Sequence, residues 1–262
     1  MTSSVRIFFL GGLTSYRALF SWLSPWVLVP TFVLGPIFQI LFFAYVGRSA
    51  GVGSDSFFLI GNAVQYASIP CLFAMGNTID GERYSHTLGL LLVSPARRTP
   101  LFLGRALPVI VNGFVVSLFA LVVGAVVLGV KLPLSSLPLL AFVVAVSAFA
   151  CTGLGLVTAA LALRVRETAT LSNLVFGMLL IFCGVNVPLS ALPGWMAAVA
   201  GWLPLTHGIA AARELAAGAP FSAVARSVGA EAGVGAIYLV IGLVLLRFLE
   251  IESRRRATLE LA

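Results

Sequence analysis

The chain has 262 residues, of which 60% are hydrophobic and 10% are charged, and its mean hydropathy is +1.08. Soluble domains carry roughly 25% charged residues, so this composition argues against a soluble enzyme. A net charge of +7 would suggest nucleic-acid binding in a soluble protein, but here the positions of the sixteen basic residues decide its meaning.

Residues 1–25 precede the first long apolar run. They lack the order of a secretory signal peptide, because Arg17 falls inside the would-be apolar core. Arg6 and Arg17 are three helical turns apart and therefore share a helix face. The pattern predicts an interfacial helix on the cytoplasmic surface, with a disordered tail as the alternative.

Six long runs follow, each with about the length that a helix needs to cross a hydrocarbon layer. Within them only Glu231 and Arg247 are charged, and both lie near the ends of the last run. Helices satisfy their own backbone hydrogen bonds in lipid, so the runs predict an all-α membrane protein with six transmembrane helices. The runs are residues 26–46, 57–76, 107–129, 138–163, 169–187 and 231–249.

The basic residues lie mainly in alternate connecting segments. If both termini are cytoplasmic, twelve lie on the inner side, and the outer side keeps only Arg48, Lys131, Arg213 and Arg226. This bias predicts that the N- and C-termini are both inside, which requires an even number of spans.

The inner segment between spans two and three, residues 77–100, has an amphipathic pattern. We expect Asp80 to cap a helix that ends at Ser94-Pro95. Its apolar stripe at helical spacing consists of Tyr84, Leu88, Leu91 and Leu92. Periodicity alone leaves two interpretations open, a docking element for a cytoplasmic partner or a surface helix resting on lipid head groups.

The outer segment, residues 188–230, contains a stretch apolar enough to count as a seventh span. A seventh crossing would place the basic tail at Arg254, Arg255 and Arg256 outside. Proline and glycine residues interrupt the stretch, and Pro204 lacks a backbone donor. We therefore expect two short helices that dip into the outer leaflet and return, broken at Pro204.

The sequence carries no recognisable catalytic, metal or nucleotide motif. The sole lysine, Lys131, is not in a phosphate-binding loop, which requires Gly-Lys followed by a hydroxyl residue. His86 and His207 lie on opposite sides of the predicted topology, and the three cysteines lack paired spacing. No cofactor is expected in this chain, and any ATP hydrolysis requires a partner. The polar side chains in the spans either line a path or join helices, and they include Asn62, Gln65, Tyr66 and Asn173.

Two motifs carry a resemblance to a known family. The inner segment has Arg83, Thr87-Leu88, Leu91-Leu92 and Ser94-Pro95 in one register, and the outer segment has Leu192-Pro193, Pro204-Leu205-Thr206, Arg213 and Gly218. This pattern resembles the membrane subunits of ABC type-2 exporters, including antibiotic-resistance pumps and permeases for lipo-oligosaccharide and polysaccharide. The sequence departs from the family pattern at Tyr84, Ser85, His86 and Gly89.

The resemblance implies a single permease domain, residues 1–262, in the inner membrane of a bacterium. It would pair with a second permease, identical or related, and with two copies of a cytoplasmic ATP-binding subunit that holds ATP and Mg. The implied cargo is an amphipathic drug-like, lipid-linked or saccharide substrate; nucleic acid is not an expected partner. The implied coupling residues are Asp80, Glu82, Arg83, Tyr84, Thr87, Leu88, Leu91, Leu92, Arg97 and Arg98. Candidates for an outer gate are Pro193, Trp195, Trp202, Pro204, His207 and Arg213, although tryptophans also anchor membrane proteins at the interface.

Two other classes stay open at this point. A membrane-embedded enzyme acting on lipids would need a site built from loop residues such as Asp80, Glu82, His86 and Glu167. A membrane scaffold would transport nothing and would need no site. Activity of the isolated chain on lipid would favour the first, and failure to move any substrate in vesicles would favour the second.

Overall fold

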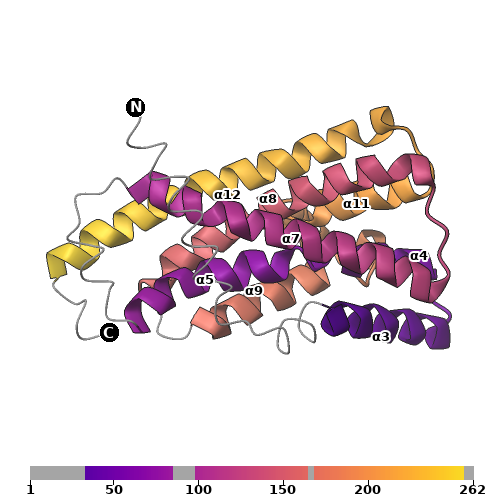
Figure 1. Cartoon of the computed structure of the whole chain (residues 1–262), viewed down its shortest axis with the longest axis horizontal. Coiled ribbons are helices and arrows are strands. Elements are labelled where there is room, and N and C mark those ends of the chain that lie inside the picture. The colour runs from indigo at the N-terminus through magenta and orange to yellow at the C-terminus, as the bar shows by residue number, and fades with distance from the viewer. Residues whose placement is uncertain (1–32, 85–97, 165–167, 257–262) are drawn as a thin grey trace.

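The computed structural model describes residues 33–84, 98–164 and 168–256, and within them every regular element is a helix (Figure 1). This confirms the predicted all-α class. The helices are α3 (Gly35–Ala50), α4 (Asp55–Gln65), α5 (Ser68–Tyr84), α7 (Arg98–Leu128), α8 (Leu137–Ala162), α9 (Thr168–Phe182), α10 (Gly194–Ala200), α11 (Thr206–Ala216) and α12 (Phe221–Arg256). Residues 1–25, with the predicted interfacial helix, lie outside the described part.

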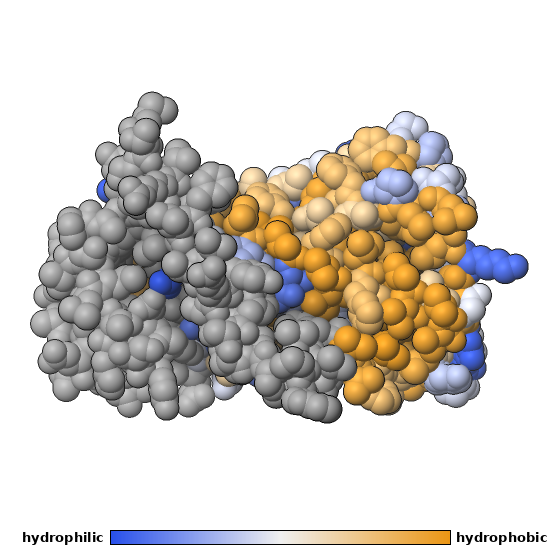
Figure 2. All heavy atoms as spheres, viewed as in Figure 1, coloured by the Kyte–Doolittle hydropathy of each residue, from blue (hydrophilic) through white to orange (hydrophobic). Residues whose placement is uncertain are grey.

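Four helical stretches are long and apolar enough to cross a membrane: Asp55–Asn77, Leu103–Leu128, Leu134–Ala162 and Phe221–Leu249. The other two predicted spans correspond to shorter described helices, α3 with 16 residues and α9 with 15, and residues 26–32 of the first run lie outside the described part. Figure 2 shows apolar side chains over most of the described part of one face. A soluble protein would not leave so large an apolar surface in water, so this surface is suited to lipid.

Helix α8 lies at the centre of the bundle and packs mainly against α12 and α5. Small residues allow the backbones to approach closely, as is usual between membrane helices. A Cβ atom on Gly153 would lie 2.6 Å from the carbonyl oxygen of Gly235, and one on Gly235 would lie 2.7 Å from Cα of Ala150. We therefore expect larger residues at either glycine to separate α8 from α12.

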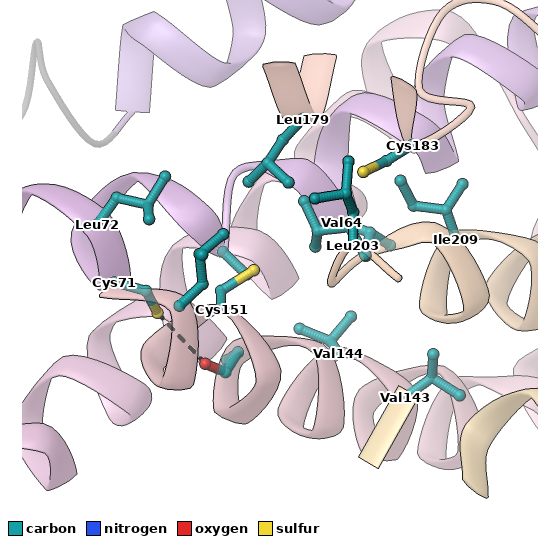
Figure 3. Close-up of a cluster of buried hydrophobic side chains, with 14 of the residues drawn as sticks. Val64, Cys71, Leu72, Val143, Val144, Cys151, Leu179, Cys183, Leu203 and Ile209 are labelled. Atoms are coloured by element: carbon teal, nitrogen blue, oxygen red, sulfur yellow. Dashed lines mark hydrogen bonds between the residues drawn. The ribbon is translucent and has the colours of Figure 1, made fainter. Parts of the chain in front are cut away.

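The three cysteines are buried in this core and are free thiols (Figure 3). The Cys71 thiol donates to the carbonyl oxygen of Ala148 at 3.4 Å and accepts from the Thr152 hydroxyl at 3.2 Å. These contacts join α5 to α8. They agree with the expectation that the cysteines pack helices rather than form a disulfide framework.

The second predicted span is broken near its middle, which the sequence analysis did not anticipate. Helix α4 ends at Gln65 and α5 begins at Ser68, because Pro70 has no N–H to donate to the carbonyl oxygen of Tyr66. Side chains satisfy nearby carbonyl groups, since Ser117 Oγ donates to Ala63 at 2.7 Å and Ser68 Oγ donates to Gln65 at 2.7 Å. Such replacement bonds make a broken helix tolerable in a membrane.

Two predicted boundaries are wrong. Helix α12 begins at Phe221, ten residues before the predicted start of the last span, so Glu231 lies inside the helix and the outer segment is shorter. The isolated charges Arg226 and Glu231 concealed a helix that starts directly after Pro220, a residue suited to a helix start. Helix α5 also runs without interruption through Asp80, so Asp80 is not an N-cap.

Candidate functional site

The outer segment folds into two short helices, α10 and α11, separated by a break at residues 201–205. This confirms the predicted pair with its interruption at Pro204. Leu205 ends the break with a φ of 78°, a left-handed conformation that strains a residue with a branched side chain. The Leu205 side chain is fully buried, so apolar contacts help to hold this conformation. With 7 and 11 residues, neither helix can cross a membrane alone.

Glu231 of α12 anchors the start of α11. Its carboxylate is fully buried, and its two oxygens accept backbone N–H bonds from Leu205 at 2.6 Å and Gly208 at 3.0 Å. Leu205 is the N-cap residue of α11 and Gly208 lies in its first turn, where N–H groups have no partner within the helix and the helix dipole favours a negative charge. Glu231 therefore caps α11 from a different helix. This role was not predicted, because the only sign of it in the sequence is an isolated carboxylate in an apolar run.

Neighbouring groups contact the irregular backbone between α10 and α11. The Cys183 thiol donates to the carbonyl oxygen of Pro204 at 3.2 Å, and Nε2 of His207 lies 3.1 Å from the carbonyl oxygen of Gly201. A Cβ atom on Gly208 would collide with the hydroxyl oxygen of Ser147 on α8. The polar backbone of the break is thus hydrogen-bonded and closely packed.

Arg213 anchors the other end of α11. Nη1 donates to the carbonyl oxygen of Gly184 at 2.8 Å, and Nη2 donates to those of Val185 at 2.9 Å and Phe57 at 3.1 Å. The guanidinium carbon also lies 3.6 Å from the centre of the Phe57 ring. Burial lowers the pKa of Arg213 to about 10, so the side chain stays positive at neutral pH. Arg213 thereby ties α11 to the segment after α9 and to the start of α4.

We expect Arg213→Gln to lower the free energy of unfolding by about 2 kcal/mol or more, because it removes charged donors from three carbonyl groups. Thermal unfolding of the purified protein measures this loss. Arg226→Gln is the matched control, since Arg226 is exposed on α12 and surface changes usually stay within about 0.5 kcal/mol. Equal stability of the two variants would contradict the anchoring role of Arg213.

A network of side-chain amides lies next to this anchor. Nε2 of Gln39 donates to Oδ1 of Asn62 at 2.9 Å and to Oε1 of Gln65 at 3.0 Å, and Nδ2 of Asn62 donates to Oδ1 of Asn186 at 2.7 Å. The network joins α3, α4 and the segment after α9. Asn62 and Gln65 are fully buried, and Tyr66 beside them is also buried. Among the described residues, no acceptor bonds Nε2 of Gln65 or Nδ2 of Asn186.

The other predicted site residues lie apart from the network. Asn173 is exposed on α9, and its Nδ2 donates to the carbonyl oxygen of Ala169 in the preceding turn. Trp195 and Trp202 are 65% and 69% exposed, which is typical of aromatic residues at a membrane interface. Pro193 is the N-cap residue of α10. Among the predicted outer residues, Arg213 and His207 therefore contact backbone carbonyl groups, whereas Trp195 and Trp202 are exposed.

The comparison with protein families decides the class of the chain. The family model described as ABC-2 type transporter matches residues 13–216, most of the chain, including α10 and α11. The chain belongs to the ABC-2 type transporter family. It is the membrane part of such a transporter, a permease domain rather than a nucleotide-binding domain. This confirms the resemblance seen in the sequence. No curated protein matches the chain.

The ABC-2 match ends at Ala216, the last residue of α11. Glu231 therefore lies beyond the matched range, yet its carboxylate holds the first turn of a helix inside that range. Hydrogen bonds from the matched part to Glu231 thus join this part to α12.

Half of the predicted coupling residues of this ABC-2 permease lie outside the described residues. Asp80, Glu82, Arg83 and Tyr84 belong to the last part of α5, and Arg98 is the first residue of α7. The segment 85–97 holds Thr87, Leu88, Leu91, Leu92 and Arg97. The ends of α5 and α7 that flank it lie at the opposite end of the bundle from α11 (Figure 1).

Proposed function

We propose that the chain is the permease subunit of an ATP-driven exporter and that a separate cytoplasmic subunit hydrolyses the ATP. The match to the ABC-2 type transporter family over residues 13–216 carries this proposal. The sequence supports it, because Lys131 stands between Val130 and Leu132 and no Gly-Lys-hydroxyl loop is present. Mg and ATP would be held by the partner, which we expect in two copies.

We infer that the path for an amphipathic drug-like, lipid-linked or saccharide substrate lies between two permeases, identical or related. Asn173 supports such a path, because it exposes an amide on an α9 face that also exposes Leu174 and Ile181. An amide facing lipid is costly unless another polar surface meets it. Asn62 and Gln65 instead support a structural role, since their amides bond α3 to α4.

We propose that the break in span two transmits the motion. Helix α4 lies on the outer side of the break. The Asn62 network and the hydrogen bond from Arg213 to Phe57 hold it to the neighbouring elements. Helix α5 lies on the inner side of the break and leads to residues 85–97, the proposed coupling segment. A helix break can absorb a change in angle between two halves, so a push on α5 can change its angle to the anchored α4.

The orientation in a bacterial inner membrane belongs to the same proposal. The C-terminal end of α12 lies at the same end of the bundle as the coupling segment's flanking helices (Figure 1), which supports a cytoplasmic location for both. We expect cysteines placed at Ser135, Ser190 and Ala217 to react with an impermeant reagent in intact cells, and one at Arg256 to be protected. The native thiols are buried, so background labelling should be low.

Labelling at Arg256 from outside would contradict the proposed orientation. Protection of Ala217 with labelling of Ser190 would show that the segment containing α10 and α11 crosses the membrane, and would contradict the re-entrant pair.

Co-purification tests the functional proposal. The tagged permease, extracted from its native membrane in mild detergent, should retain an ATP-binding subunit and hydrolyse ATP. The same permease expressed alone should show no ATPase activity. ATPase activity of the isolated chain, or an absence of any ATP-binding partner in the native extract, would overturn the proposal.

A further inference from the structure

A groove of about 360 Å³ lies at the turn between α7 and α8. Its walls are apolar side chains from both helices and from the turn, including Val122, Val126, Leu132 and Leu137, and the single charged residue among its lining is Lys131. Val126 in the wall is 77% exposed, and Leu134, an apolar residue beside the groove, is 84% exposed. The volume is within the range of small-molecule sites, roughly 300 to 1,000 Å³.

The turn that forms the groove is built by regular capping bonds. Gly129 has a φ of 68°, its N–H donates to the carbonyl oxygen of Val126 at 3.3 Å, and the N–H of Val130 donates to that of Ala125 at 2.9 Å. These two bonds end α7 in a Schellman motif, which fixes the direction of the chain that follows. A short 3-10 turn, Leu134–Ser136, then leads into α8. Lys131 therefore projects from a defined turn between two helices.

Lys131 offers a positive charge to the groove. It is exposed, and no ion pair within the described part of the chain involves it. Arg48, on the same predicted side, differs because its Nη2 lies 2.5 Å from a carboxylate oxygen of Asp55. The groove thus combines an apolar wall at the end of α7, a helix long and apolar enough to cross a membrane, with a cation in the turn that directly follows it.

We propose that this groove binds an anionic phospholipid, with an acyl chain against α7 and α8 and the phosphate group at Lys131. A phospholipid supplies an apolar chain in the hydrocarbon layer and an anionic phosphate group at the interface with water. A second apolar helix would match the apolar wall but would make no use of the Lys131 charge. The site goes beyond the transport function, and its location does not depend on which side of the membrane is cytoplasmic.

Photo-crosslinking of the full chain in lipid nanodiscs tests the proposal. The discs contain phosphatidylcholine and a minor fraction of a photoactivatable lipid, either phosphatidylglycerol or phosphatidylcholine, and labelled peptides are identified by mass spectrometry. We expect phosphatidylglycerol to label residues 122–137 about fivefold more than phosphatidylcholine does, the ratio that one basic residue near the surface provides. Equal labelling by the two lipids would overturn the proposal.

Variants separate the two parts of the site. Lys131→Gln should reduce phosphatidylglycerol labelling to the phosphatidylcholine level, whereas Arg226→Gln, with the same charge change on the same predicted side, should not. Val126→Trp should fill the groove and reduce labelling by both lipids, whereas Val115→Trp, exposed on α7 outside the groove, should not. Loss of labelling in either control, or full labelling of Lys131→Gln, contradicts the site.

Soluble glycerol phosphate distinguishes a lipid site from a simple anion site. We expect an excess of it to leave phosphatidylglycerol labelling unchanged, because it lacks the acyl chain that the groove holds. Strong competition would show that Lys131 binds phosphate alone, and would overturn the assignment of the groove to lipid.

Discussion

The Glu231→Ala permease is expected to reach the membrane but to lose most of its export activity. The change removes both acceptors from the N–H groups of Leu205 and Gly208 and leaves these buried donors without a partner. Each unsatisfied buried donor costs about 1 to 3 kcal/mol, and the strained backbone at Leu205 would no longer be held by the carboxylate. We therefore expect α11 to lose its fixed position, with a lower unfolding temperature.

Two further variants make this prediction specific. Glu231→Gln keeps the shape and one oxygen but places an NH2 donor against a backbone donor, so its effect should lie between those of wild type and Glu231→Ala. Glu214→Gln is the control, because Glu214 is exposed on α11. Thermal unfolding and ATP-dependent export are measured on the same preparations. Wild-type stability and export of Glu231→Ala would show that the buried carboxylate does not position the outer pair.

The second large effect is expected at the inner segment. Leu91→Asp adds a charge to the apolar stripe that we propose docks into the ATP-binding subunit. Losing one anchor of a helix in a groove costs about 1 to 4 kcal/mol, which weakens docking roughly five- to a thousandfold. Substrate-stimulated ATP hydrolysis should therefore be lost while the permease still inserts normally. Arg83→Glu should act more weakly, since an exposed ion pair contributes about 0 to 1 kcal/mol.

Leu134→Asp provides the matched control for Leu91→Asp. It makes the same change at an exposed leucine in the turn between α7 and α8. Retention of the ATP-binding subunit and ATPase activity are compared for the two variants. Wild-type retention and activity of Leu91→Asp would rule out the docking role of this stripe and would favour a helix that rests on lipid head groups.

The long helices were predictable because the surrounding lipid imposes a simple rule on them. A span exposed to hydrocarbon must be apolar over its whole length, so the predicted run 138–163 nearly coincides with α8, Leu137–Ala162. The break between α4 and α5 has a different cause, because Pro70 lacks a backbone N–H. Apolarity does not report hydrogen bonds, so the run 57–76 appeared continuous.

The anchors of α11 were less accessible to sequence reasoning. Glu231 bonds backbone N–H groups 23 and 26 residues away, and backbone groups have no sequence signature. Arg213 was selected by its place in a motif, but its carbonyl partners include Phe57, 156 residues away. For the polar residues of the spans, composition left two roles open. The structure joins Asn62 and Gln65 in one network and leaves Asn173 on another helix.

Transport in sealed vesicles tests the central claim most directly. The permease and its co-purified ATP-binding subunit are reconstituted together, with a fluorescent amphipathic substrate, and movement is followed after ATP is supplied on the side of the ATP-binding subunit. We expect substrate to move away from that side only when both subunits and hydrolysable ATP are present, and not with the Leu91→Asp permease. Equal movement by the permease alone, without ATP or the second subunit, would contradict the claim.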